Sequence, residues 1–222
     1  MCGIFGFITK QGRRPDLARL RRIAAETESR GRHAFGLAWI GSDGRLYSYK
    51  RPGSATDDLG SLERCRDALA VIGHCRFATH GSPNDNANNH PHRAGRGWLV
   101  HNGVVFNHSE LAARYRLALR TRCDSEVLAL LLARIPGSIA QRGARVANLA
   151  EGPLAMLGLW NQPARLLLVR RDRPISFGET RGGIYFGSLP GELPGRPQSV
   201  PERLAHLIVF QHGQLSHAAC GL

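Results

Sequence analysis

The sequence predicts an α+β fold with mostly antiparallel sheets. Predicted strands and helices come in blocks and do not alternate as regular β-α-β units. A Gly-Ser-Asp-Gly turn at 41–44 joins two strand-like runs, which is typical of a hairpin. The chain has 222 residues, of which 42% are hydrophobic. This is enough to bury a large core, and we expect residues 1–222 to form a single domain.

The first third of the chain begins with a short apolar strand and an amphipathic helix. Leu17, Leu20 and Ile23 recur at helical spacing after Pro15, a residue that favours the first turn of a helix. The hairpin follows, and then one more helix and strand. The elements expected here are strands at 3–8, 34–40, 45–50 and 70–76 and helices at 15–29 and 59–69.

The rest of the chain opens with a segment, 81–96, whose Asn, Pro, His and Gly content predicts a loop. Three helices follow the next strand, and the tail is a series of strands separated by Pro/Gly turns. The elements expected here are strands at 97–102, 153–160, 165–170, 183–187 and 206–211 and helices at 109–118, 124–134 and 138–149.

The formal net charge is +13, which raises the possibility of a nucleic-acid partner. Only Lys10 and Lys50 among the 30 basic residues are lysines, and the arginines are dispersed along the chain. Abundant Arg, Ala, Gly and Pro are what GC-rich codons favour. We therefore do not expect nucleic acid to be the partner, although the charge leaves it open.

No apolar run is long enough to span a membrane, and no signal peptide is recognisable. The five cysteines form no CxxC or paired pattern, which fits reduced thiols better than a disulfide framework. We expect a cytoplasmic protein with no membrane partner.

Cys2 is the first candidate nucleophile. If the initiator Met1 is removed, one residue carries a thiol and a free α-amino group, whose pKa of about 7.7–8.0 suits a general base. Nucleophile and base would then belong to the same amino acid. The alternative is a small buried cysteine at the start of a strand.

Three later segments add polar groups. Arg76, followed by Thr79 and His80, stands at a predicted strand end and is suited to capturing a carboxylate; the alternative is a surface arginine. Asn102 and the N–H of Gly103 would make a two-donor oxyanion hole, although Asn-Gly also marks turns. Asp124 would accept a substrate ammonium, or simply cap the next helix.

Five motifs occur in the order found in class II glutamine amidotransferase domains, which are N-terminal nucleophile hydrolases. The motifs are MCGI at 1–4, GHCRFATHG at 73–81, NNHPH at 88–92, HNGVVFN at 101–107 and DSEV at 124–127. The chain most resembles the glutaminase domains of glucosamine-6-phosphate synthase and glutamine phosphoribosylpyrophosphate amidotransferase, over nearly its whole length. The resemblance implies a four-layer αββα sandwich without a synthase domain.

The resemblance also implies roles. Cys2 would attack the glutamine amide and form a γ-glutamyl thioester, with Asn102 and Gly103 holding the oxyanion. Asp124 would bind the α-ammonium of the substrate. The α-carboxylate would be bound by Arg76, assisted by Thr79 and His80. Phe77 would also belong to the substrate-binding residues. Arg30 and Gly31 would belong to a supporting loop.

Two positions depart from the family pattern. His33 stands where the family usually has Asp, and Phe77 where related chains often have Trp. These departures concern the loop and the flap over the substrate more than the chemistry.

The ammonia would pass to a separate synthase or ligase subunit, with no cofactor and no metal. Alternatives are a free-standing amidohydrolase acting on another γ-glutamyl amide and a basic, non-catalytic binding module. A metal hydrolase is a further alternative because histidines are dense between 74 and 101, but their spacing matches no known zinc pattern.

Overall fold

Two stacked antiparallel sheets form the centre of the structure, a computed structural model that describes residues 1–222. Every strand pairing within the two sheets is antiparallel. The first sheet has the strand order β11 (Gln198–Ser199), β9 (Ser176–Glu179), β10 (Gly183–Gly187), β1 (Gly3–Thr9), β4 (Ala68–Arg76), β2 (Ala34–Gly41), β3 (Leu46–Pro52). The second has the order β13 (Gln214–Gly221), β12 (Leu204–Gln211), β8 (Ala164–Arg171), β7 (Leu154–Trp160), β6 (Gly97–Gly103), β5 (His92–Ala94).

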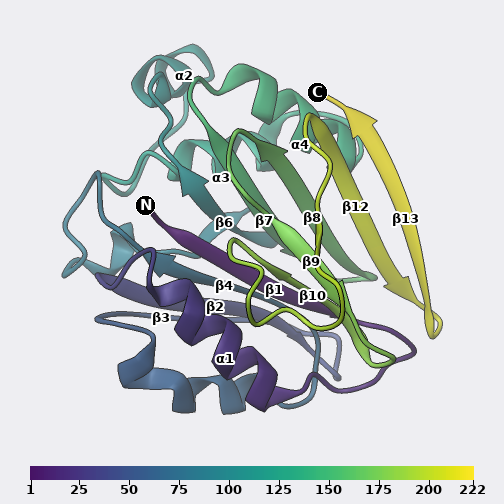
Figure 1. Ribbon diagram of the computed structural model, residues 1–222. Helices are drawn as coiled ribbons and strands as arrows, with labels where there is room; N and C mark the ends of the chain where they lie inside the picture. Colours follow the sequence, from purple (N-terminus) through teal and green to yellow (C-terminus); the bar gives the residue numbers. More distant parts are fainter.

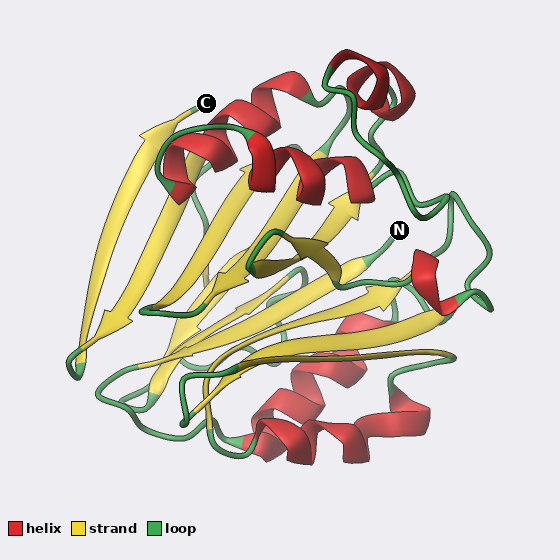
Figure 2. Ribbon diagram, turned by 180° about the vertical axis from the view of Figure 1, so that it is seen from behind, coloured by secondary structure: helices red, strands yellow, loops and turns green.

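Helices cover the outer face of each sheet (Figures 1 and 2). The first sheet is covered by α1 (Leu17–Glu28) and the 3₁₀ helix η1 (Thr56–Cys65). The second is covered by α3 (Glu126–Arg134) and α4 (Ile139–Leu149), with α2 (His108–Arg114) beside them. A second 3₁₀ turn, η2 (Asn86–Asn88), lies in the loop before β5. The predicted α+β fold in αββα layers is therefore confirmed.

The central strands are largely apolar because both of their faces are covered. All seven residues of β1 are buried. Ile4 and Ile8 enter the cluster between the sheets, whereas Phe5 and Phe7 enter the cluster beneath α1, as alternation along a strand requires. β1 therefore holds a fixed position at the middle of the first sheet.

Some sequence predictions were wrong. The helix expected at 59–69 is the 3₁₀ helix Thr56–Cys65, kinked at Asp58, in a stretch where Asp57, Asp58 and Gly60 all disfavour an α-helix. The loop expected at 81–96 contains η2 and the short strand β5. Strands β9, β11 and β13 were not expected; β11 has two residues, and β13 is a largely exposed edge strand with a weak apolar pattern.

The fold brings two distant strand ends together. Gly3 pairs with Cys75, so Cys2 lies beside the end of β4, where Arg76 is the last residue. β1 and β4 both contact β6 of the other sheet, and Nε2 of His74 donates to the carbonyl of His101 across the gap at 3.0 Å. The ends of β4 and β6 and the start of β1 thus meet.

None of the helices combines the length and the apolar character that a membrane-spanning helix needs.

Candidate active site

Cys2 lies against the backbone of Phe77, half-buried at the junction of β1 and β4. Its Sγ donates to the Phe77 carbonyl and accepts from the Phe77 N–H, each at 3.3 Å. Burial raises the pKa of the Cys2 thiol, while the contact with the Phe77 backbone opposes that shift. The resting thiol is therefore protonated, and its use as a nucleophile requires a base.

Asn102 is placed on β6 with its side-chain amide buried and unused. It is 1% exposed, and neither its Oδ1 nor its Nδ2 has a hydrogen-bond partner. A buried polar group without a partner is destabilising by about 1–3 kcal/mol. An amide left in this state is available to a ligand.

Gly103, the next residue, requires glycine. Its φ is +154°, and a Cβ there would lie 2.1 Å from the Pro153 carbonyl oxygen. The His101 side chain on the other side of Asn102 forms a 2.8 Å hydrogen bond from Nδ1 to Oγ of Ser125. Burial lowers the pKa of His101 to about 4, so this ring is neutral and ties β6 to the start of α3.

Arg76 is buried, and its guanidinium is already engaged by the chain. One terminal nitrogen donates to Asn89 Oδ1 at 2.7 Å; the other donates to the carbonyls of Gly81, at 3.0 Å, and His80. Asn89 in turn donates to the Pro83 carbonyl at 2.8 Å. The guanidinium therefore organises the loop after β4 and is held in a fixed orientation.

Asp124 is also buried, and it is not a helix cap. α3 begins at Glu126, with Ser125 at the N-cap and no capping side-chain hydrogen bond, so the cap interpretation of Asp124 was wrong. Its Oδ2 instead accepts the N–H of Val105 at 2.7 Å. Its Oδ1 lies 3.8 Å from Nδ1 of His80, too far for a strong bond. Oδ1 also accepts a weak hydrogen bond from the Cys123 thiol at 3.9 Å. One carboxylate oxygen thus fixes the segment after Gly103, and the other is held only by this weak contact.

The predicted helpers Thr79 and His80 do not contact the Arg76 guanidinium through their side chains. Thr79 Oγ1 and His80 Nδ1 lie 3.3 Å from each other, and only the His80 carbonyl reaches Arg76. The Phe77 side chain is 46% exposed. The segment 77–80 is therefore the accessible wall of the site.

The supporting loop at 30–33 contacts both Cys2 and this wall. Nε of Arg30 donates to the Cys2 carbonyl at 3.0 Å. A Cβ on Gly31 would lie 2.5 Å from the nitrogen of Phe77, so only glycine permits this approach. His33 accepts the N–H of Ala78 through Nδ1 at 2.9 Å and stacks on Phe77, with ring centroids 5.0 Å apart.

The sequence did not assign supporting roles to several residues that hold this site: His33, His74, Asn89, His101 and Ser125. The motifs themselves held a partial signal, because His74, Asn89, His101 and Ser125 lie within the segments 73–81, 88–92, 101–107 and 124–127. Their hydrogen-bond partners could not be read from spacing.

One cluster has the composition of a metal site. The ligand atoms of His90, His92 and Cys123 lie within 4.8 Å of one another, and all three residues are buried. However, the Lys50 ammonium donates to the Asn89 carbonyl at 2.6 Å beside this cluster, and the Arg76 guanidinium donates to the same asparagine. The half-buried Lys50 and the buried Arg76 place two positive charges at this position, which oppose a divalent ion, and we assign no metal to the cluster.

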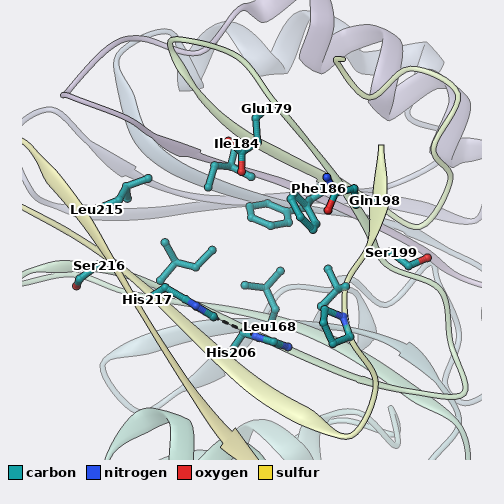
Figure 3. Close-up of a pocket in the computed structure, with 14 residues that line it drawn as sticks. Leu168, Glu179, Ile184, Phe186, Gln198, Ser199, His206, Leu215, Ser216 and His217 are labelled. Carbon is teal, nitrogen blue, oxygen red and sulfur yellow. Dashed lines mark hydrogen bonds between the residues drawn. The ribbon is translucent and has the colours of Figure 1, made fainter. Parts of the chain in front are cut away.

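A cavity of about 450 Å³ lies elsewhere, between the β8–β12–β13 and β9–β10 edges of the two sheets (Figure 3). Its walls are mainly apolar, and Nδ1 of His206 and Nε2 of His217 are 3.0 Å apart at its floor. None of the candidate residues lines it. The cavity is therefore separate from the site around Cys2.

Comparisons with known proteins agree on a single family. The family described as glutamine amidotransferase domain matches residues 56–211. Glutamine–fructose-6-phosphate aminotransferase (isomerizing) of Leifsonia xyli subsp. xyli is 36% identical over 202 residues, covering 85% of this chain and 32% of the relative. The enzyme of the same name from Symbiobacterium thermophilum is 35% identical over 227 residues, covering 97% and 35%. The chain thus spans about a third of the length of these relatives.

Solved structures show the same fold at lower sequence identity. Glutamine phosphoribosylpyrophosphate amidotransferase from B. subtilis superposes with a TM-score of 0.79 at 20% identity, covering 98% of this chain and 49% of that one. A glutamine aminotransferase class-II domain protein from Silicibacter pomeroyi gives a TM-score of 0.60 at 17% identity, with both chains fully covered.

Proposed function

The chain belongs to the class II glutamine amidotransferases, and from this premise we propose that it hydrolyses the side-chain amide of glutamine to glutamate and ammonia. The observation that carries the proposal is Asn102, a buried amide with no partner on the strand that contacts β1. Its Nδ2 and the N–H of Gly103 would donate to the oxyanion that forms when Cys2 attacks. Donors placed for a developing charge are among the largest contributions to catalysis.

Cys2 would form the covalent intermediate. Its sulfur attacks the amide carbon, and the thiol proton moves to the α-amino group of the same residue. The tetrahedral intermediate then collapses: the C–N bond breaks, the leaving nitrogen takes the proton from the amine, and ammonia departs. Water, deprotonated by the amine, attacks the γ-glutamyl thioester; the sulfur leaves with that proton, and glutamate is released.

This scheme needs Met1 to be removed, so that Cys2 carries the amine. The Met1 sulfur accepts contacts from Arg173, at 3.0 Å, and from Arg30, at 3.8 Å. Arg30 also donates through Nε to the Cys2 carbonyl at 3.0 Å, so its guanidinium would remain beside Cys2 after Met1 is removed. Nearby positive charge disfavours an ammonium, so this neighbour would favour the neutral, basic amine.

Arg76 and Asp124 would read the two charges of free glutamine, the α-carboxylate and the α-ammonium. The support is their burial with fixed orientations: Arg76 by three acceptors of the loop and Asp124 by the Val105 N–H. Oδ1 of Asp124, which accepts only a weak hydrogen bond from the Cys123 thiol, is the acceptor left for an ammonium. Phe77, Thr79 and His80 would form the outer wall of the pocket.

We further propose that residues 1–222 act as one glutaminase domain and that the ammonia passes to a separate acceptor enzyme. The relatives are glutamine–fructose-6-phosphate aminotransferases, whose name pairs glutamine with a second substrate, and the two sheets pack into one layered unit. A cytoplasmic location is supported by the five free cysteines.

Steady-state kinetics of the purified chain test the proposal. We expect release of glutamate and ammonia from glutamine that is slow for the isolated chain and rises when the correct acceptor enzyme and its substrate are added. Full-speed hydrolysis unaffected by any partner would favour a free-standing amidohydrolase. Absence of glutamine hydrolysis under every condition would contradict the glutaminase assignment.

A further inference from the structure

We propose that His33 is a positioning residue for the Cys2 thiol, acting through the Phe77–Ala78 backbone. The inference rests on the proposed glutaminase function for its kinetic consequence, but its geometric content concerns the thiol itself. His33 touches neither Cys2 nor the expected position of the substrate carboxylate. It holds the peptide groups that do contact the sulfur.

The backbone of His33 is anchored on both sides. Its N–H donates to the Arg76 carbonyl at 2.9 Å, and its carbonyl accepts from the Gly53 N–H at 3.0 Å. These bonds join His33 to the end of β4 and to the segment after β3. The ring therefore projects from a fixed point toward the segment that follows Arg76.

The ring makes two contacts with that segment. Nδ1 accepts the Ala78 N–H at 2.9 Å, and the ring stacks on Phe77 with an interplanar angle of 27°. An Nδ1 that accepts carries no proton, so this ring is the neutral tautomer protonated on Nε2. Because Phe77 is 46% exposed, core packing does little to fix it.

The hydrogen bond between His33 and Ala78 affects Cys2 through the neighbouring residue, Phe77. The Phe77 N–H and carbonyl both contact the sulfur at 3.3 Å, and the contact of the thiol with the Phe77 backbone lowers its pKa against the raising effect of burial. If the Ala78 N–H loses its acceptor, the Phe77 peptide groups lose one of the bonds that fix them. Phe77 is then held less firmly beside the sulfur, and its N–H, which is the group that favours the thiolate, is less well placed.

Three substitutions separate the hydrogen bond from the stack. His33→Phe keeps an aromatic ring for Phe77 but has no acceptor. His33→Asn and His33→Asp place an oxygen close to the position of Nδ1 and have no ring. If the acceptor is what positions the thiol, the two oxygen-bearing variants keep more function than His33→Phe. If the stack or general packing matters, the order is reversed or all three fall together.

Two readouts are measured on full-length protein at equal folding, checked by circular dichroism. The first is glutamine hydrolysis: we expect His33→Phe to lower kcat about tenfold, the equivalent of one hydrogen bond of roughly 1.4 kcal/mol, with KM little changed. The second is the rate of Cys2 alkylation by iodoacetamide against pH, resolved by peptide mass spectrometry. We expect its profile to move to higher pH in His33→Phe and to stay near wild type in His33→Asn and His33→Asp.

The second readout does not require turnover. If wild type fails to hydrolyse glutamine, the proposed function fails, while the alkylation profile still tests His33. An unchanged profile in His33→Phe, or an equal shift in all three variants, would overturn the positioning role.

Discussion

The two sides of the candidate site are built differently. On the nucleophile side, Asn102 is buried without a partner and the Cys2 thiol makes only two weak contacts, both with Phe77. On the substrate-binding side, which comprises the two residues proposed to bind the charged groups of glutamine, Arg76 donates three hydrogen bonds and Asp124 accepts one from the Val105 backbone.

This difference separates two kinds of function. Groups whose bonds form only during the reaction remain unsatisfied in the resting protein and weaken it. Groups that orient a bound substrate are held in advance by the chain and help to stabilise it. We therefore expect substitutions on the nucleophile side to lower activity without lowering stability, and substitutions on the other side to lower activity and stability together.

The largest expected effect is at Cys2. Cys2→Ala removes the nucleophile, and loss of a nucleophile of this kind lowers kcat by at least about 10⁴-fold. The fold should be retained, because the side chain is half-buried and its sulfur makes only weak bonds. Glutamine hydrolysis and thermal unfolding measure both properties. Cys220→Ala, at another half-buried free cysteine, is the matched control and should keep wild-type turnover.

Asp124→Asn tests the substrate-binding side. The amide oxygen can still accept the Val105 N–H, but the charge is gone, so the variant isolates the interaction with an ammonium. Loss of one partner of a buried charge pair corresponds to roughly 2–5 kcal/mol, and we expect kcat/KM for glutamine to fall by about 30-fold or more. In wild type, N-acylated glutamine should be a poor substrate. Equal rates for glutamine and its N-acylated form would show that Asp124 only holds the backbone.

Asn102→Ala tests the nucleophile side while leaving the nucleophile, Cys2, in place. Removing one oxyanion donor typically lowers kcat by about 10²–10³, and KM should change little. The free energy of unfolding should not fall as it does for a hydrogen-bonded residue, because no hydrogen bond of the protein is removed. Asn89→Ala, which removes an acceptor of Arg76, is the contrasting variant and should unfold more easily. Equal destabilisation by Asn102→Ala and Asn89→Ala would contradict the proposed difference between the two sides.

The last test concerns stability alone, at two histidines that join the strands of the two sides. Burial lowers the pKa of His74 to about 3 and of His101 to about 4. In the unfolded chain each of the two imidazoles would titrate near 6.5. As the pH falls below this value, the unfolded state binds protons at these histidines, whereas the folded state does not. Each histidine then lowers the free energy of unfolding by about 1.4 kcal/mol per pH unit, down to about pH 4 for His101 and about pH 3 for His74. Denaturant unfolding measured between pH 7 and 4 checks this; constant stability over that range would contradict it.

Local signals in the sequence predicted the α-helices and central strands, but not the 3₁₀ helix at Thr56–Cys65. The helical spacing in α1 and the turn at 41–44 depend on neighbouring residues, and both were confirmed. The exposed strand β13 has no clear apolar alternation, and it becomes a strand only by pairing with β12. Whether this segment forms a strand depends on its pairing partner β12, and the periodicity of its own sequence carries no information about that partner.

The same limit applies to the site. Motifs pointed to residues near Asn102 and Arg76, but the partners of those residues come from other segments. Asp124 fits a helix cap by sequence, yet its carboxylate bonds to Val105, 19 residues earlier. The stack of His33 on Phe77 likewise joins residues that are far apart in the chain. Motif spacing in the sequence identified residues that could take part in the reaction. Only the fold showed which of their polar groups already have hydrogen-bond partners within the protein.

The central claim is that Cys2 carries both the thiol and the amine of the reaction. It is tested most directly by mixing the purified protein with glutamine, quenching in acid within one turnover and measuring the N-terminal peptide by mass spectrometry. We expect a peptide that begins at Cys2, lacks Met1 and carries a γ-glutamyl group on the sulfur. Active protein that retains Met1 throughout, or a γ-glutamyl group on any other residue, would contradict the account.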